Sequence, residues 1–364
     1  MNNENVVYKL FSDCIPVKGI TRSLILDLTR KEYHFVPTEL CERLLISSVL
    51  PTGKIPKQYL EFLIEKELIF ECSPSNTNLY PPLNKEWFYP AEISNAILSV
   101  TNESDLESSF NQLLNLGCRH YMLSINPPLD LRAVVELLKQ YDQSNILTLE
   151  LYVQYSSEMT EEVLANMLQN NNRISYILCH YSNSSKVVSI RNTRGNICYY
   201  NKGIEFLNSV LSPELFTINM PFYTESLKYN VFYNRKVCID QYGNIKNYLS
   251  HNKVFGNIHD DNISDIISRE DFQWLWTINK DKIAICNDCE FRYMCLDSRK
   301  PIENGDGYCF SKNETCPYNP YICLWEGQEG YVPVEKCGTY GRETGFVPDK
   351  KRIKELNRKI WGDE

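Results

Sequence analysis

The chain has 364 residues, of which 43% are hydrophobic and 23% are charged, and its formal net charge is −8. This length predicts two or three domains, and the composition excludes a fibrous or wholly disordered protein. The acidic balance argues against a protein whose main task is to bind a nucleic-acid backbone. We find neither an apolar run of about 18 residues, which would predict a membrane span, nor a basic and apolar start typical of a signal peptide. We therefore expect a cytoplasmic protein that does not span a membrane.

The first predicted domain, residues 1–78, is a small α/β unit. Its expected elements are a hairpin (22–28 and 32–36), a helix capped by Thr38, a helix from about Pro56, a strand (68–72) and a linker (73–78). The apolar residues expected to face inward from the helical region are Leu40, Leu44, Leu45, Val49, Tyr59, Leu60, Leu63 and Ile64. Hairpin, helix, helix and strand is the order of a winged-helix-like module.

The second predicted domain, residues 88–225, alternates apolar strands with amphipathic helices. The expected strands are 96–100, 120–125, 146–153 and 174–179, with two further candidates at 196–200 and 215–220. The expected helices are 104–116, opened by a capping box from Ser104 to Glu107, 129–141 and 160–169. This alternation predicts βαβ units and a parallel sheet. Because the segment is too short for eight units, we expect a partial (β/α) barrel or an open sheet.

The third predicted domain, residues 226–340, is rich in turns and cysteine. A hairpin is expected over 235–240 and 244–249, and seven of the 14 cysteines follow between positions 286 and 337. A basic helix, 350–359, is expected in the tail, residues 341–364. A region so poor in periodic structure needs an additional stabilising element, and a metal centre can provide it.

The cysteine spacing points to a metal centre. Cys286 and Cys289 form a Cys-x2-Cys pair, which places two thiolates on one side of a metal, and Cys295 follows six residues later. A fourth ligand would have to return from a distant loop. Thiolates with no nearby histidine suit Zn²⁺ or an iron–sulfur cluster. The alternative is that they are buried, reduced cysteines that act as small hydrophobic residues.

Several motifs in the last third resemble a SPASM domain. They are Asn234-Arg235-Lys236, Gly243–Asn247, Phe255–Ile258, Leu275–Asp281, Cys286–Cys295 and Cys316–Tyr321. The segment Tyr8–Gly19 resembles one subfamily, the SPASM-domain peptide maturases of "grasp-with-SPASM" systems. Such proteins are encoded beside an ATP-grasp ligase and a short ribosomally made precursor peptide. The resemblance therefore implies a three-part chain: a winged-helix-like peptide-recognition unit, a partial barrel similar to a radical SAM domain, and a SPASM domain.

The resemblance also implies a set of cluster ligands. SPASM domains hold two [4Fe–4S] clusters, and the ligands of one match Cys286, Cys289, Cys295 and Cys316, with Cys309 or Cys323 as alternatives to Cys316. The ligands of the other cluster are expected at positions that hold Phe232, Tyr248 and Ser298 in this chain. None of these three is a plausible cluster ligand. We therefore expect one [4Fe–4S] cluster, with Zn²⁺ as the alternative occupant.

A radical SAM enzyme needs a Cys-x3-Cys-x2-Cys triplet, and this sequence has none. The expected barrel would then be a pseudo-radical-SAM domain without S-adenosylmethionine chemistry. The N-terminal unit resembles elements that bind a leader peptide as an added strand. The residues expected to take part are Tyr33, His34, Phe35, Val36, Tyr59 and Leu63.

These observations give three hypotheses for function. The first is a component that binds the precursor peptide and presents it to the ATP-grasp ligase. The second is an enzyme that modifies the peptide itself through a redox-active cluster or the barrel mouth. The third is a zinc-stabilised interaction protein.

Overall fold

The computed structural model describes residues 6–51, 53, 55–204, 211–304, 309–312, 316–341 and 345–362. Contacts between residues divide the chain into two compact units. Unit 1 contains Met1–Trp87, Leu211–Val231 and Ile278–Glu364, and unit 2 contains Phe88–Val210 and Phe232–Thr277. The chain therefore passes from one unit to the other four times, and its two ends belong to the same unit.

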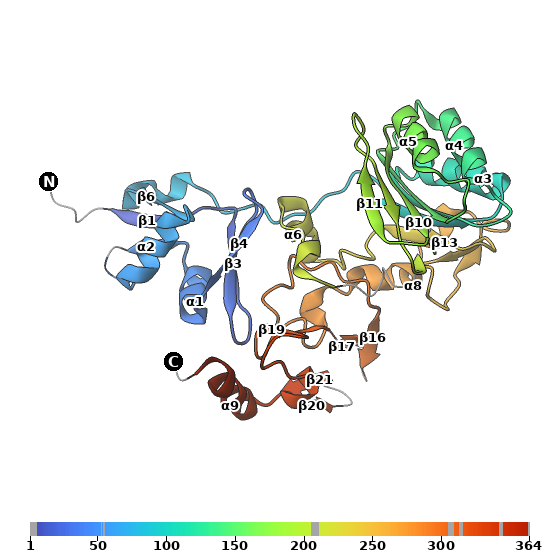
Figure 1. Ribbon diagram of the computed structural model, residues 1–364. Coiled ribbons are helices and arrows are strands. Elements are labelled where there is room, and N and C mark those ends of the chain that lie inside the picture. The colour runs from blue at the N-terminus through green and yellow to red at the C-terminus, as the bar shows by residue number, and fades with distance from the viewer. Residues whose placement is uncertain are drawn as a thin grey trace. The chain divides into compact units, whose positions relative to one another are not determined.

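Unit 2 is built on a nine-stranded mixed sheet (Figure 1). Its strands are β7 (Asn95–Val100), β8 (His120–Ile125), β9 (Thr148–Gln154), β10 (Ile174–His180), β11 (Lys186–Ser189), β12 (Asn196–Tyr199), β13 (Lys236–Ile239), β14 (Asn244–Lys246) and β15 (Gly256–Asn257). They lie in the order β11-β12-β10-β9-β8-β7-β13-β14-β15, and the run from β12 to β13 is parallel. The predicted parallel βαβ organisation is thus confirmed as an α/β fold, in the form of an open sheet.

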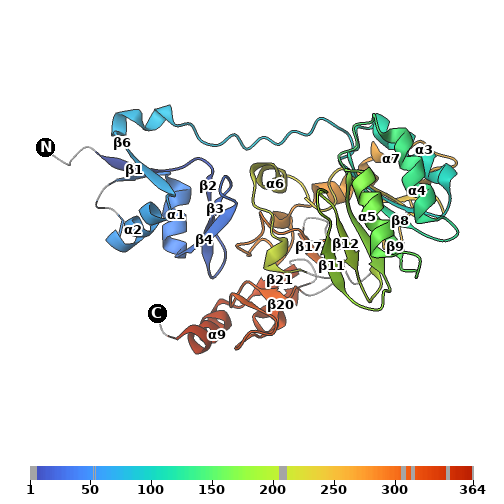
Figure 2. The same ribbon diagram turned by 45° about the horizontal axis from the view of Figure 1, so that its top comes forward.

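Helices cover one face of this sheet. The helices of unit 2 are α3 (Glu103–Asn115), α4 (Leu131–Leu138), α5 (Glu161–Asn170), α7 (Ile263–Ile267) and α8 (Glu270–Gln273). Figure 2 shows α3, α4 and α5 side by side along the sheet. Thr160 caps α5 by accepting the N–H of Val163 at 3.3 Å. The predicted capping box at Ser104 is wrong, because α3 begins at Glu103 and is capped by Asn102, two residues before Ser104.

The predicted strand at 215–220 is also wrong. This segment contains the end of a short 3₁₀ turn, Pro213–Leu215, and the start of α6 (Met220–Ser226). Asn219 caps α6 by accepting the N–H of Phe222 at 2.9 Å. Phe216, Ile218 and Met220 pack against the apolar core of unit 1. The apolar alternation thus reflects packing against a core rather than pairing in a sheet.

The N-terminal module of unit 1 contains two three-stranded sheets and two helices. Its elements are β1 (Val7–Leu10), β2 (Cys14–Val17), β3 (Ser23–Asp27), β4 (Glu32–Val36), α1 (Thr38–Ile46), β5 (Val49–Pro51), α2 (Lys57–Glu65) and β6 (Ile69–Cys72). The sheets have the orders β5-β1-β6 and β2-β3-β4. The predicted hairpin, both helices and the closing strand are confirmed, whereas β1 and β2 were not predicted. Thr38 is the first helical residue and makes no cap, because Pro37 occupies that position.

Two apolar cores hold this module. The first, which includes Leu40, Leu44 and Leu63, lies between the helices and the strands. The inward positions predicted for Leu45 and Ile64 are wrong, since these side chains are 54% and 45% exposed. In the second core, Leu24 and Leu26 of β3 pack with aromatic residues from positions 291 to 325. One face of the β2-β3-β4 sheet therefore packs against residues from much later in the chain.

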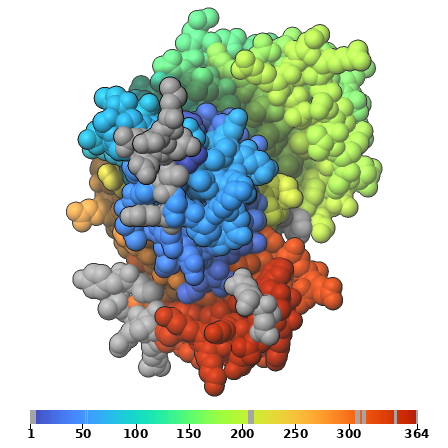
Figure 3. All heavy atoms as spheres, turned by 90° about the vertical axis from the view of Figure 1, so that its left-hand side faces the viewer, coloured from blue at the N-terminus to red at the C-terminus, as the bar shows by residue number. Residues whose placement is uncertain are grey.

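The C-terminal part of unit 1 consists of short hairpins and one helix. Its elements are β16 (Pro301–Asn304), β17 (Cys309–Lys312), β18 (Tyr318–Asn319), β19 (Leu324–Trp325), β20 (Gly338–Gly341), β21 (Gly345–Pro348) and the predicted basic helix α9 (Lys350–Trp361). Thr21 donates a hydrogen bond to the carbonyl oxygen of Tyr321 at 2.9 Å, and Figure 3 shows the blue N-terminal module directly against the red C-terminal residues. In the described ranges, no helix has the length and apolar character of a membrane span.

Candidate functional site

The cysteine turn, residues 286–295, folds through local backbone hydrogen bonds. Ile285 has a left-handed φ of 72°, which reverses the chain just before Cys286. The N–H of Cys289 then donates to the carbonyl oxygen of Cys286 at 3.1 Å. The N–H of Ala284 donates to Phe310 in β17 at 2.7 Å, which ties the start of the turn to a neighbouring strand.

Four cysteine side chains of this region interact electrostatically. Burial raises the pKa of Cys289 well above its usual value, and the charges of Cys295 and Cys316 raise it further. Burial also raises the pKa of Cys295 to about 12, with smaller contributions from Cys316 and Cys286. Cys286 also acts on the pKa of Cys316, which burial raises. The four predicted ligands are therefore close enough to interact electrostatically, and each is a free cysteine.

Two buried cations lie beside these thiols. Lys280 Nζ is 3.6 Å from Asp297, and Arg299 contacts the same carboxylate at 2.9 Å. The side chains of Lys280, Arg299 and Asp297 are only 11%, 8% and 2% exposed. Burial opposes the charge of Lys280, but the charges of Cys295, Asp297 and Cys286 raise its pKa overall. Lys280 lowers the pKa of Cys295 and Arg299 lowers that of Cys316, so the two cations partly oppose the effect of burial on these thiols.

The residue types of these four side chains fit a thiolate-ligated centre, although their arrangement is not that of a single-ion site. Four thiols without histidine match the ligands of a [4Fe–4S] cluster, and a structural Zn²⁺ site can use the same set. In the part of the chain that the structure describes, no three His, Cys, Asp or Glu side chains converge as ligands of a single metal ion. Of the alternatives to Cys316, Cys323 is buried and interacts with Glu290 and Arg22, and the side chain of Cys309 lies outside the described residues.

A buried acid–base contact joins the cysteine turn to the N-terminal module. Glu290 is 1% exposed, and its Oε1 accepts hydrogen bonds from Tyr318 Oη at 2.6 Å and from Arg22 Nε at 3.1 Å. Burial raises the pKa of Glu290, although both partners oppose this rise. Sequence reasoning missed this contact. Its only signal was a charged residue between Cys289 and the aromatic Phe291.

The predicted peptide-binding strand, β4, lies at one edge of its sheet. The rings of Tyr33 and Phe35 are 5.3 Å apart and lie 5.8 and 6.0 Å from the ring of Phe291. Phe35 is 39% exposed, and the guanidinium of Arg22 lies 3.5 Å from its ring centre. This edge therefore presents aromatic side chains that rest on the cysteine turn.

The other predicted peptide-binding residues lie on the α2 side of β4. The ring of His34 is 6.4 Å from that of Phe62 in α2, and Tyr59 is partly buried. Val36 and Leu63 are only 4% and 0% exposed. In this structure Val36 and Leu63 are part of the core beneath the edge.

The three positions expected to have lost a cluster fall in both units. Phe232 and Tyr248 belong to unit 2, where their ring centres are 5.2 Å apart. Lys236 Nζ lies 3.5 Å from the centre of the Phe232 ring, and Tyr248 is 7% exposed. Ser298 belongs to unit 1, between Asp297 and Arg299. Phe232 and Tyr248 therefore pack as aromatic side chains in unit 2, and Phe232 offers no ligand atom.

Comparisons with known proteins add little to this description. No family model matches the chain, and no curated protein is significantly similar to it. Among solved structures, the chain is similar to the crystal structure of Streptococcus suis SuiB, with 10% identity and a TM-score of 0.28. The match covers 79% of this chain and 94% of that chain. A likeness at this level carries no argument about fold or function.

Proposed function

We propose that this protein is a component of ribosomal peptide maturation. It binds a precursor peptide through its N-terminal module and presents the peptide to a partner ATP-grasp ligase. In this proposal the four cysteines hold one [4Fe–4S] cluster, with Zn²⁺ as the alternative. The chain performs no radical SAM chemistry, because its sequence has no Cys-x3-Cys-x2-Cys triplet.

The observation that carries the proposal is the edge of β4. No other strand among the described residues pairs with the outer side of β4, so its backbone can accept an added strand. Tyr33 and Phe35 offer aromatic surface next to that edge. Backbone hydrogen bonds would supply affinity, and the aromatic pair would select apolar side chains in the peptide.

The proposed cluster would act on this edge through the cysteine turn. Cys289, Glu290 and Phe291 are consecutive, and Phe291 packs under Tyr33 and Phe35. A bound cluster would fix the turn by holding four thiolates together, and full thiolate ligation would leave it no open position for a substrate. The residues of the turn would then support the peptide edge, and the bond-forming step would belong to the ligase.

Peptide binding can be tested with the precursor encoded beside the protein. We expect Phe35→Ala to weaken precursor binding by about tenfold, because a truncated aromatic contact typically costs on the order of 1–2 kcal/mol. The matched control is Phe88→Ala, which truncates a phenylalanine that is 83% exposed in unit 2. Equal affinities of the wild type and Phe35→Ala in a titration calorimeter would overturn this site.

The metal content can be measured after anaerobic purification. A single cluster predicts about four irons and four sulfides per chain. The Cys295→Ser variant should lose most of this iron, whereas Cys72→Ser, a cysteine in β6, should keep it. Iron near twice the predicted amount would refute the single cluster, and zinc without iron would support the alternative.

One observation favours a second candidate, an enzyme acting at the sheet of unit 2. Tyr176 Oη donates a hydrogen bond to Glu150 at 3.0 Å and also bonds to Tyr152, so that a carboxyl and two phenols form a chain. Burial raises the pKa of Glu150, as in many proton-transferring acids. Incubating the precursor with this protein alone, and then with the ligase, separates the candidates. A change in peptide mass without the ligase would support the enzyme and refute the presenting role.

A further inference from the structure

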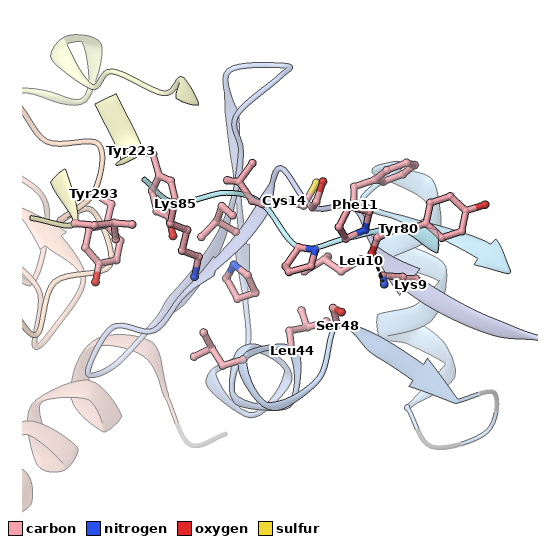
Figure 4. Close-up of a pocket in the computed structure, with 18 of the residues that line it drawn as sticks. Lys9, Leu10, Phe11, Cys14, Leu44, Ser48, Tyr80, Lys85, Tyr223 and Tyr293 are labelled. Atoms are coloured by element: carbon pink, nitrogen blue, oxygen red, sulfur yellow. Dashed lines mark hydrogen bonds between the residues drawn. The ribbon is translucent and has the colours of Figure 1, made fainter. Parts of the chain in front are cut away.

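A groove of about 930 Å³ lies within unit 1, along β2, the edge of the β2-β3-β4 sheet that is opposite to β4. Its floor comes from β2, the other edge strand of the β2-β3-β4 sheet, and from the end of β1. The linker that follows β6, residues 73–87, forms one wall, and residues of α1, α6 and the cysteine turn complete the groove. Figure 4 shows these segments around the groove, with Lys9 and Lys85 toward opposite ends.

The charged residues that line the groove are all cations. They are Lys9, Lys18, Lys85 and Arg292. Lys18 pairs with Glu42 at 2.6 Å and Arg292 with Asp281 at 3.1 Å, so these two cations are partly neutralised. Across the described ranges, no ion pair involves Lys9 or Lys85. The groove is therefore lined by positive charge, although the net charge of the chain is −8.

Lys9 is held in place by the linker. Its ammonium group donates to the carbonyl oxygens of Thr77 at 2.6 Å and Tyr80 at 2.8 Å. Carbonyl oxygens orient the ammonium group but do not cancel its charge. The exposed Lys85 lies five residues beyond Tyr80 on the same linker. The linker thus places two cations whose charges are not neutralised along a single groove.

Apolar and aromatic surface lies between the two ends. The rings of Phe11, Phe70 and Tyr80 form a cluster near Lys9, with successive centres 4.8 and 4.7 Å apart in tilted and edge-to-face contacts. Leu45 and Leu79 remain 54% and 71% exposed at the rim. Exposed apolar side chains inside a concave surface are typical of binding sites.

We propose that this groove binds an extended peptide segment in which acidic residues flank apolar ones. The cations toward each end match two carboxylates, and the aromatic cluster and rim leucines match the side chains between them. This inference rests on the proposed function, because the natural source of such a segment would be the precursor peptide. The groove is a second contact, separate from the β4 edge, and would fix the direction in which the precursor crosses the module.

The test uses a short fluorescein-labelled synthetic peptide in which two glutamates flank leucine and phenylalanine residues. A second peptide with glutamine in place of each glutamate is the control. We expect the acidic peptide to bind about tenfold more tightly, since two exposed ion pairs add modestly to affinity. Its affinity should fall as ionic strength rises.

Variants of the full chain locate the binding site. Lys85→Glu should weaken binding of the acidic peptide by about tenfold, and Leu45→Ser should weaken both peptides. Lys354→Glu is the matched control, since Lys354 is an exposed lysine of α9 outside the groove. Equal affinity for the two peptides, or equal losses from Lys85→Glu and Lys354→Glu, would overturn the inference. Because Phe35→Ala tests the precursor at β4 independently, failure at the groove would be distinguishable from failure of the proposed function.

Discussion

The contact between Arg22 and Glu290 gives a sharp test of how the N-terminal module and the cysteine turn depend on each other. Replacing Arg22 with glutamine removes the charge that faces a carboxylate buried to 1% exposure. The carboxylate keeps the hydrogen bond from Tyr318. We expect the cysteine turn of the Arg22→Gln variant to open more readily than that of the wild type.

The magnitude follows from the geometry of the pair. Removing one partner of a fully buried ion pair costs about 3–5 kcal/mol, because the other charge is left without compensation. Arg22 is 29% exposed, so water screens part of its interaction, and Tyr318 remains as a donor. We therefore expect a loss of about 2–3 kcal/mol in the free energy of opening the turn.

Hydrogen exchange measured by mass spectrometry on the peptide covering residues 286–295 reports this local opening. A loss of about 2–3 kcal/mol corresponds to exchange that is about 30- to 150-fold faster. The double variant Arg22→Gln/Glu290→Gln should recover much of the loss, because it has no charge left to compensate. The control Arg132→Gln changes an exposed arginine of unit 2. Exchange less than threefold faster in Arg22→Gln, or no recovery in the double variant, would refute the reasoning.

Three further predictions concern unit 2. Burial raises the pKa of Glu150, so the folded state loses stability as pH rises through that pKa. In urea unfolding, the Glu150→Gln variant should therefore be about 1 kcal/mol more stable than the wild type at about pH 8 and no more stable near pH 4. Burial opposes the charge of Asp240, but hydrogen bonds from Lys246 and the turn lower its pKa overall. The Asp240→Asn variant should therefore lose about 1–2 kcal/mol of unfolding free energy at neutral pH. This difference should vanish in acid, where the wild-type carboxylate is protonated. Asn102→Ala should cost about 1 kcal/mol by removing the cap of α3, and an unchanged melting temperature would contradict this role.

Sequence patterns predicted the elements whose signal is local and long enough. Strands β7 to β10 were predicted because each is a run of six or seven residues between polar turns. Strands β1 and β2 have four residues each and show no regular alternation of apolar and polar residues, so no sequence pattern indicated them. The strand expected at 215–220 failed for the opposite reason, since its alternation serves a core made by other segments.

In the candidate site, too, the sequence indicated the local features but not the contacts between distant residues. The spacing of Cys286, Cys289 and Cys295 is local, and the sequence could indicate it. Arg22 and Glu290 are 268 residues apart, and no pattern along the chain links them. The groove depends on side chains from β1, β2, α1, α6, the linker and the cysteine turn, so it exists only in the folded unit. Local motifs can indicate ligands, whereas the surfaces around them require the structure.

The interrupted course of the chain affects how the protein can be made. During synthesis, Leu24 and Leu26 leave the ribosome long before Phe291 and Tyr318, the residues that bury them to 0% and 1% exposure. The nascent N-terminal module therefore carries an uncovered apolar sheet while all of unit 2 is being translated. Unit 2 has its own sheet and can fold in that interval, whereas unit 1 can close only when the last third of the chain emerges. We expect slow translation or early truncation to favour chaperone binding and aggregation through this sheet, even where every residue proposed to bind peptide is intact.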